Sequence, residues 1–106
     1  MRYRDMEKGF QYAFSAALSA YRRGSTPIGC AILDARNECA ATGENSIYAN
    51  DDQEMIHHHH LAHAEINAIL KAGSGGIDGF DSTSCVLYTT MEPCIMCFGA
   101  IVMCYY

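Results

Sequence analysis

Two short motifs hold the residue types that metal chemistry needs. Cys94 and Cys97 are three positions apart, and this spacing puts both sulfurs on one face of a helix, within reach of a single ion. Pro93 favours the first turn of that helix, where the helix dipole and the free N–H groups favour thiolates. His63 begins another predicted helix and offers a third ligand. Three protein ligands with one open position are typical of a catalytic zinc site.

The chemistry available to such a metal site depends on the carboxylate of Glu65. Residues two positions apart do not share a face in the middle of a helix. At a helix N-terminus both side chains reach round the exposed end, so His63 can bind the metal while Glu65 approaches its water. A carboxylate there can take a proton from the water and return it to a leaving group, which is typically worth ~10²–10⁴ in rate. The spacing differs from the metalloprotease His-Glu-x-x-His, so peptide hydrolysis is disfavoured.

The pattern of apolar residues and turn residues predicts the elements that position these motifs. In the first helix the apolar residues recur every three or four positions and Gly24 ends the pattern; this stripe comprises Phe10, Phe14, Ala17, Leu18 and Tyr21. A long loop over 45–61 follows a predicted hairpin. The elements come in the order α-β-β-α-β-α: helix 5–23, strands 28–33 and 38–43, helix 63–72, a buried strand 84–90 and helix 93–103. This alternation predicts an α/β layer fold.

Composition predicts one domain covering residues 1–106. Half of the 106 residues are hydrophobic, enough for a packed core. The net charge of -5 argues against nucleic acid as a partner, because phosphate contacts need Lys and Arg. No secretory signal and no apolar stretch near ~18 residues is visible, so we expect no membrane partner and a cytoplasmic location. Thiols stay reduced there, so the six cysteines are assigned to metal binding or burial and not to disulfides.

The two motifs in this order, H-x-E followed by P-C-x-x-C, form the signature of zinc deaminases. The chain resembles the cytidine and deoxycytidylate deaminase superfamily, especially its guanine deaminase and tRNA adenosine deaminase branch. The resemblance runs from about residue 5 to the C-terminus. The stretches that carry it are 26–31 (TPIGCA), 43–45 (GEN), 62–69 (AHAEINAI) and 90–101 (TMEPCIMCFGAI).

The resemblance implies a three-layer α-β-α fold and a hydrolytic deaminase. His63, Cys94 and Cys97 match the zinc ligands of the family, and Glu65 matches the residue that shuttles protons. Asn45 matches an asparagine that hydrogen-bonds the substrate in relatives. Such enzymes replace an exocyclic amine of a base by oxygen and release ammonia.

The chain departs from the family pattern in two places. Relatives of this branch often have Asp-Pro-Thr-Ala before the histidine, where this chain has residues 59–62 (HHLA). The family also continues with further strands after the second metal helix, whereas this sequence stops at Tyr106. We therefore expect a C-terminally short or minimal version of the fold.

Each singled-out residue also has a structural interpretation. Cys94 and Cys97 are, in that alternative, thiols packed in the core, and Glu65 is a solvated carboxylate that stabilises its helix dipole. Asn45 is either a functional residue or a turn residue. The histidines at 57–60 are expected in a solvated loop, with an adventitious metal site or a substrate-facing lid as alternatives. Four cysteines are expected to be small buried hydrophobes: Cys30, Cys39, Cys85 and Cys104.

Three functions remain in competition. The first is a zinc-dependent deaminase acting on a small nucleobase, nucleoside or nucleotide. The second is editing of a base in tRNA or single-stranded nucleic acid, for which Arg22, Arg23 and Lys71 would have to form a basic patch. The third is a zinc-stabilised scaffold without turnover. Because a short sheet leaves an unpaired edge, and because relatives form oligomers, we also predict a homo-oligomer, most simply a dimer.

Overall fold

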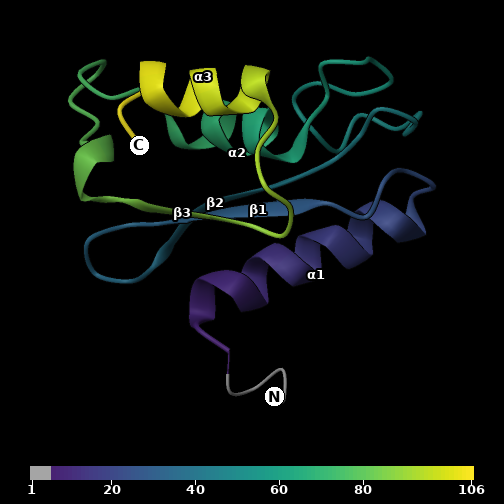
Figure 1. Cartoon of the computed structure of the whole chain (residues 1–106), viewed down its shortest axis with the longest axis horizontal. Coiled ribbons are helices and arrows are strands. Elements are labelled where there is room, and N and C mark those ends of the chain that lie inside the picture. Colours follow the sequence, from purple (N-terminus) through teal and green to yellow (C-terminus); the bar gives the residue numbers. More distant parts are fainter. Residues whose placement is uncertain (1–5) are drawn as a thin grey trace.

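A three-stranded sheet lies between helices in the computed structural model, which describes residues 6–106. Helix α1 (Lys8–Arg22) covers one face of the sheet. Helices α2 (Ala64–Ala72) and α3 (Ile95–Met103) lie side by side over the other face (Figure 1). A short 3-10 helix, Ser82–Ser84, precedes the last strand. The element order and the three-layer α-β-α arrangement confirm the predicted fold class.

Strand β1 (Gly29–Leu33) is the centre of the sheet and pairs antiparallel with both neighbours. It forms the predicted hairpin with β2 (Cys39–Glu44), and β3 (Val86–Thr89) lies on its other side. Successive side chains of a strand point to opposite faces. In β1, Cys30 and Ile32 pack in the cluster below α2, whereas Ala31 and Leu33 pack in the cluster with Ala13 of α1. The central strand is therefore buried on both faces.

The prediction that the third strand is buried was wrong. β3 is an edge strand, and within residues 6–106 no further strand pairs with its outer side. Val86 is 52% exposed. An apolar run of this length fits a buried strand or an edge strand equally well, because it carries no information about which neighbours pair with it.

The apolar stripe of the first helix does not face the core. The buried residues of α1 are all small, and they are Gly9, Ala13, Ala16, Ala17 and Ala20. The large stripe residues are partly exposed on the flank of the helix, at Phe10, Phe14, Leu18 and Tyr21. Phe10 packs edge-on against Tyr88 of β3, with ring centroids 5.0 Å apart. Of the five stripe residues, Ala17 alone is buried.

Glycines explain why small residues face the sheet. A side chain at Gly29 would place its Cβ 2.0 Å from the carbonyl oxygen of Ala13, and one at Gly43 would place it 2.2 Å from the carbonyl oxygen of Ala64. Non-bonded atoms do not approach one another to such distances, so α1 and α2 lie this close to the strands only because these positions lack a Cβ. The close approach leaves room for alanine but not for phenylalanine below α1.

The long loop between β2 and α2 is fastened by buried polar side chains. Asn67 of α2 is fully buried; its amide donates to the carbonyls of Glu44 (3.2 Å) and Ile56 (3.1 Å), and its oxygen accepts from the Ile56 N–H (2.8 Å). Glu54 in the loop is also buried and forms an ion pair with Lys71 of α2. These contacts tie the loop to the helix that carries the H-x-E motif.

Arg23, just after α1, fastens the same loop from the other side. Its guanidinium donates to Glu44 (2.7 Å) and Ser46 (3.2 Å) and forms an ion pair with Asp51. The hydrogen bond from Arg23 holds the pKa of the Asp51 carboxyl below its ordinary value. Gly24, with φ of 81°, then turns the chain away from the helix, as predicted.

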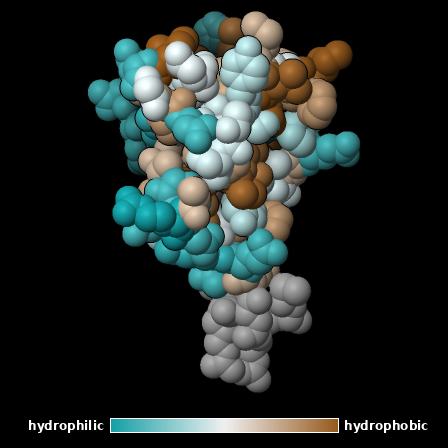
Figure 2. All heavy atoms as spheres, turned by 90° about the vertical axis from the view of Figure 1, so that its left-hand side faces the viewer, coloured by the Kyte–Doolittle hydropathy of each residue, from teal (hydrophilic) through white to brown (hydrophobic). Residues whose placement is uncertain are grey.

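The outer side of α3 and the edge of β3 expose apolar side chains. Ile95 is 92% exposed, and Phe98, Val102 and Met103 are exposed with it. Apolar atoms gather in the upper part of Figure 2, at the height of α3 in Figure 1. No helix within residues 6–106 is both long and apolar enough to cross a bilayer. The predicted homo-oligomer and cytoplasmic location stay predictions.

All six cysteines are free thiols, so no disulfide framework forms. Cys30 is fully buried, as predicted, and its burial raises the pKa of its thiol. Cys39, Cys85 and Cys104 are only half-buried. The prediction of buried hydrophobes is therefore confirmed for one of these four.

Candidate metal centre

The N-termini of α2 and α3 meet and bring three ligand-type side chains together. His63 is the N-cap residue of α2, Cys94 is the N-cap residue of α3, and Cys97 lies in the first turn of α3. Pro93 therefore lies just before the N-cap and not inside the first turn as predicted. The Nδ1 atom of His63 is 3.6 Å from the sulfur of Cys94 and 3.4 Å from the sulfur of Cys97.

These distances fit one tetrahedral ion. Zinc bonds of about 2.3 Å to sulfur and about 2.05 Å to nitrogen, at the tetrahedral angle, separate the nitrogen and the sulfur by about 3.6 Å. The three candidate ligand atoms lie within 4.8 Å of one another. Within residues 6–106 they form the only group of three His, Cys, Asp or Glu side chains close enough for one ion. One imidazole and two thiols are also a donor set that zinc prefers.

Glu65 lies in the first turn of α2 beside the same sulfurs. It is only 4% exposed and hydrogen-bonds with Cys97. Burial raises the pKa of the Cys97 thiol, and the Glu65 carboxylate and Cys94 raise it further. Burial and these two neighbours thus oppose ionisation of the Cys97 thiol, whereas its position near a helix N-terminus predicts the opposite direction. A bound dication reverses this balance, because a coordinating thiol is deprotonated.

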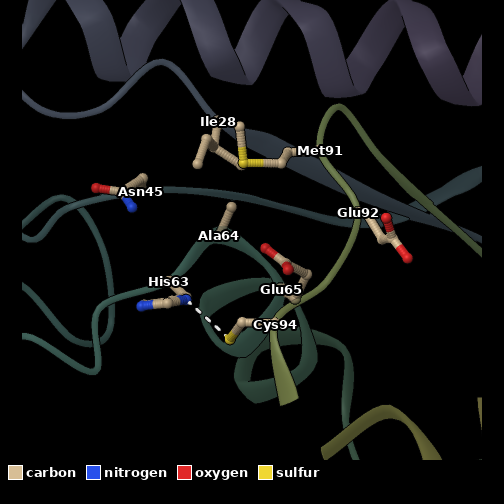
Figure 3. Close-up of a pocket in the computed structure, with 8 residues that line it drawn as sticks. All are labelled: Ile28, Asn45, His63, Ala64, Glu65, Met91, Glu92 and Cys94. Carbon is tan, nitrogen blue, oxygen red and sulfur yellow. Dashed lines mark hydrogen bonds between the residues drawn. The ribbon is translucent and has the colours of Figure 1, made fainter. Parts of the chain in front are cut away.

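A small pocket opens beside the trio. Ile28 and Met91 form an apolar wall, and His63, Glu65 and Cys94 lie opposite them (Figure 3). The other lining residues are Asn45, Ala64 and Glu92, so no Lys or Arg among residues 6–106 lines the pocket. The arrangement suits a flat, uncharged ring that lies between an apolar wall and a polar one.

Asn45 borders this pocket from the end of β2. It is 3% exposed, and its backbone N–H donates to the carbonyl of Ile28 at 3.0 Å. Its side-chain oxygen accepts from the hydroxyl of Ser25 at 2.7 Å and from the N–H of Ile47 at 3.2 Å. The structure thus brings all five predicted site residues to one place.

Sequence reasoning missed the apolar wall and Glu92. Met91 and Glu92 stand directly before the Pro-Cys pair, and Ile28 stands directly before β1, so their closeness to recognised motifs was the available signal. The histidines at 58–60 are exposed, as expected for a solvated loop. His57 is half-buried, and its Nδ1 lies 3.1 Å from the carbonyl of Glu54. None of the four joins the metal-type trio.

Comparison with known proteins places this chain among deaminases. The sequence model of the cytidine and deoxycytidylate deaminase zinc-binding region matches residues 3–105. A cytosine deaminase from Candida albicans is 32% identical over 99 residues, which cover 93% of this chain and 60% of that protein. A tRNA-specific adenosine deaminase from Buchnera aphidicola is 38% identical over 90 residues, which cover 85% of this chain and 54% of that protein.

Solved structures show the same fold. The crystal structure of guanine deaminase from Bacillus subtilis superposes with a TM-score of 0.68 and 32% identity, covering 92% of this chain and 57% of that one. The chain thus spans little more than half the length of these three relatives. Through its zinc-binding region, the chain belongs to the cytidine and deoxycytidylate deaminase family.

Proposed function

We propose that the protein is a zinc-dependent hydrolytic deaminase that removes an exocyclic amine from a small nucleobase, nucleoside or nucleotide. His63, Cys94 and Cys97 would hold the ion, and Glu65 would transfer protons. The observation that carries the proposal is the meeting of this trio with a buried carboxylate at a pocket that has one apolar wall. A packing role for the two thiols would not require an imidazole 3.4–3.6 Å from both sulfurs.

The chain's own residues account for the proton transfers. A bound zinc ion lowers the pKa of a coordinated water and so supplies a nucleophile at neutral pH. Glu65 accepts the proton of the attacking water and delivers it to the ring nitrogen next to the reacting carbon. Glu65 then moves the second proton to the departing nitrogen, so that water and the amine give a carbonyl and ammonia. Ile28 and Met91 hold the ring against the polar wall and exclude solvent.

Editing of a base in tRNA is the second candidate, favoured by the similarity to tRNA-specific adenosine deaminases. The charges of the described chain support a small substrate instead. Arg23 is engaged by Glu44 and Asp51, and Lys71 is engaged by Glu54. Of the three cations considered for a basic patch, two are therefore committed to fastening the loop, and phosphate contacts need such cations.

The test is ammonia release by the zinc-loaded protein from cytosine, guanine, adenine and their nucleosides. We expect turnover with one of these compounds, and a loss of at least about 100-fold for Glu65→Gln at equal zinc content, because the proton transfer is removed. Glu38→Gln is the matched control: it makes the same change in an exposed carboxylate just before β2 that does not line the pocket.

Each result separates the candidates. Turnover that survives Glu65→Gln would contradict the proposed mechanism. Ammonia released from a tRNA anticodon stem-loop, and from none of the small compounds, would favour editing. A folded, zinc-loaded protein without turnover on either substrate class would favour the scaffold function.

A further inference from the structure

The hydroxyl of Ser25 holds the side chain of Asn45 from behind the pocket. Ser25 follows α1 and is 7% exposed. Its Oγ accepts a hydrogen bond from the backbone N–H of Tyr48 at 3.3 Å and donates one to Oδ1 of Asn45 at 2.7 Å. The acceptor side of this hydroxyl is used by Tyr48, so its hydrogen is directed at Asn45.

A second contact determines which end of the Asn45 amide faces which way. The backbone N–H of Ile47 lies 3.2 Å from the same Oδ1 atom. A backbone N–H can only donate, so the atom it meets must be the oxygen and not the nitrogen of the amide. Both lone pairs of that oxygen are therefore occupied. In Figure 3 the nitrogen of Asn45 lies on the side of His63, with the oxygen turned away.

We propose, on the basis of the function proposed above, that Ser25 is a positioning residue that fixes Asn45 as a hydrogen-bond donor to the substrate. The pocket then selects bases that present an acceptor, a ring nitrogen or a carbonyl oxygen, to the Asn45 NH₂ group. Without the Ser25 hydroxyl, only the longer 3.2 Å contact from the Ile47 N–H holds the Asn45 oxygen, so the amide turns more freely and also offers its oxygen to the substrate. A site built around a directed polar group rejects an analogue that lacks the matching atom far more strongly than an apolar pocket rejects a small change of size.

The test measures coupling between Ser25 and one atom of the ligand. Equilibrium binding of adenine, guanine and cytosine is measured beside analogues in which one acceptor nitrogen at a time is replaced by C–H. All proteins are zinc-loaded and carry Glu65→Gln, so that no reaction intervenes. With Ser25 present, we expect one replacement to weaken binding by at least about 10-fold. With Ser25→Ala, the same replacement should weaken binding by less than about 3-fold, while Ser25→Thr, which keeps a hydroxyl, should restore the discrimination.

Asn45→Asp is a second variant that keeps the shape of the side chain. It retains an oxygen for Ser25 and Ile47 but replaces the two amide donors by an acceptor. We expect it to bind the parent base no better than the C–H analogue. This variant keeps the proposal testable should Ser25→Ala perturb folding.

The opposing outcomes are distinct. If Ser25→Ala weakened the parent base and every analogue by one common factor, Ser25 would be merely structural and the proposal would be wrong. Equal binding of parent and analogues with Ser25 present would also overturn it. Discrimination without ammonia release by the protein that has Glu65 would remove the proposed function and leave this inference standing. Absence of binding by all three bases would overturn both.

Discussion

The two helices that meet at the candidate metal centre are supported very differently. The α2 half, which comprises β2, α2 and the loop between them, is tied together by buried polar side chains, among them Asn67 and Glu54. The α3 half, which comprises β3 and α3, has an unpaired sheet edge and an exposed apolar helix face within the described chain. His63 and Glu65 thus stand on a well-held element, whereas both cysteines stand on a loosely held one. The difference indicates that a bound ion would contribute more to the order of α3 than to that of α2.

The largest expected effect is that of metal removal on α3. Chelation of the zinc-loaded protein should increase amide hydrogen exchange over 95–103 by at least about 10-fold more than over 64–72, because buried contacts alone keep α2 folded. Hydrogen exchange with mass spectrometry measures both segments in one experiment. Cys97→Ser should reproduce the pattern without a chelator. An equal increase in amide exchange in both helices would show that the two halves do not differ in their dependence on the metal.

The next effect concerns the ion pair that fastens the loop in the α2 half. Lys71→Met leaves the carboxylate of Glu54, with a 1% exposed side chain, without its cation. Breaking a buried pair costs about 3–5 kcal/mol; we expect about 2–3 kcal/mol here, since Lys71 is partly in solvent. Urea denaturation measures the loss. Arg36→Met is the matched control, because the pair of Arg36 and Glu38 is exposed and should contribute about 0.5 kcal/mol or less.

The smallest expected effect is a decrease of stability at alkaline pH, caused by ionisation of Tyr106 beside the end of α2. Tyr106 donates to the carbonyl of Gly73 at 2.6 Å, and burial raises the pKa of its hydroxyl to about 12. Because this pKa is higher in the folded protein than in the unfolded chain, the contribution is complete below pH 10 and is lost as the pH rises from about 10 to 12. Denaturation at pH 8 and pH 11 should show a smaller alkaline decrease for Tyr106→Phe than for the unmodified protein. An identical decrease in both would contradict this assignment.

The sequence predicted the half of the site that depends on local spacing. Cys94 and Cys97 are close because three positions make almost one helical turn, and His63 and Glu65 are close because both stand at one helix end. The glycine that ends α1 and the antiparallel hairpin were also predicted, since turn residues act over a few positions.

Long-range packing could not be predicted in the same way. The periodicity of Phe10, Phe14 and Leu18 was real, but Gly29 lets α1 approach so closely that alanines, and not the large residues, face the sheet. The side-chain hydrogen-bond partners of Glu54 and Asn67 are 10 to 23 positions away, and no local sequence pattern indicates such pairs. Ser25 and Asn45 are likewise 20 positions apart and meet only because the hairpin returns beside the end of α1.

We expect the two halves to meet at a zinc ion held by one imidazole and two thiolates, with one position open. X-ray absorption at the zinc edge of the loaded protein reports the ligands of the ion. We expect two sulfur ligands at about 2.3 Å, one imidazole nitrogen at about 2.0–2.1 Å and one further light atom, with one sulfur lost in Cys94→Ser. A spectrum with no sulfur ligand, or with four, would contradict this expectation.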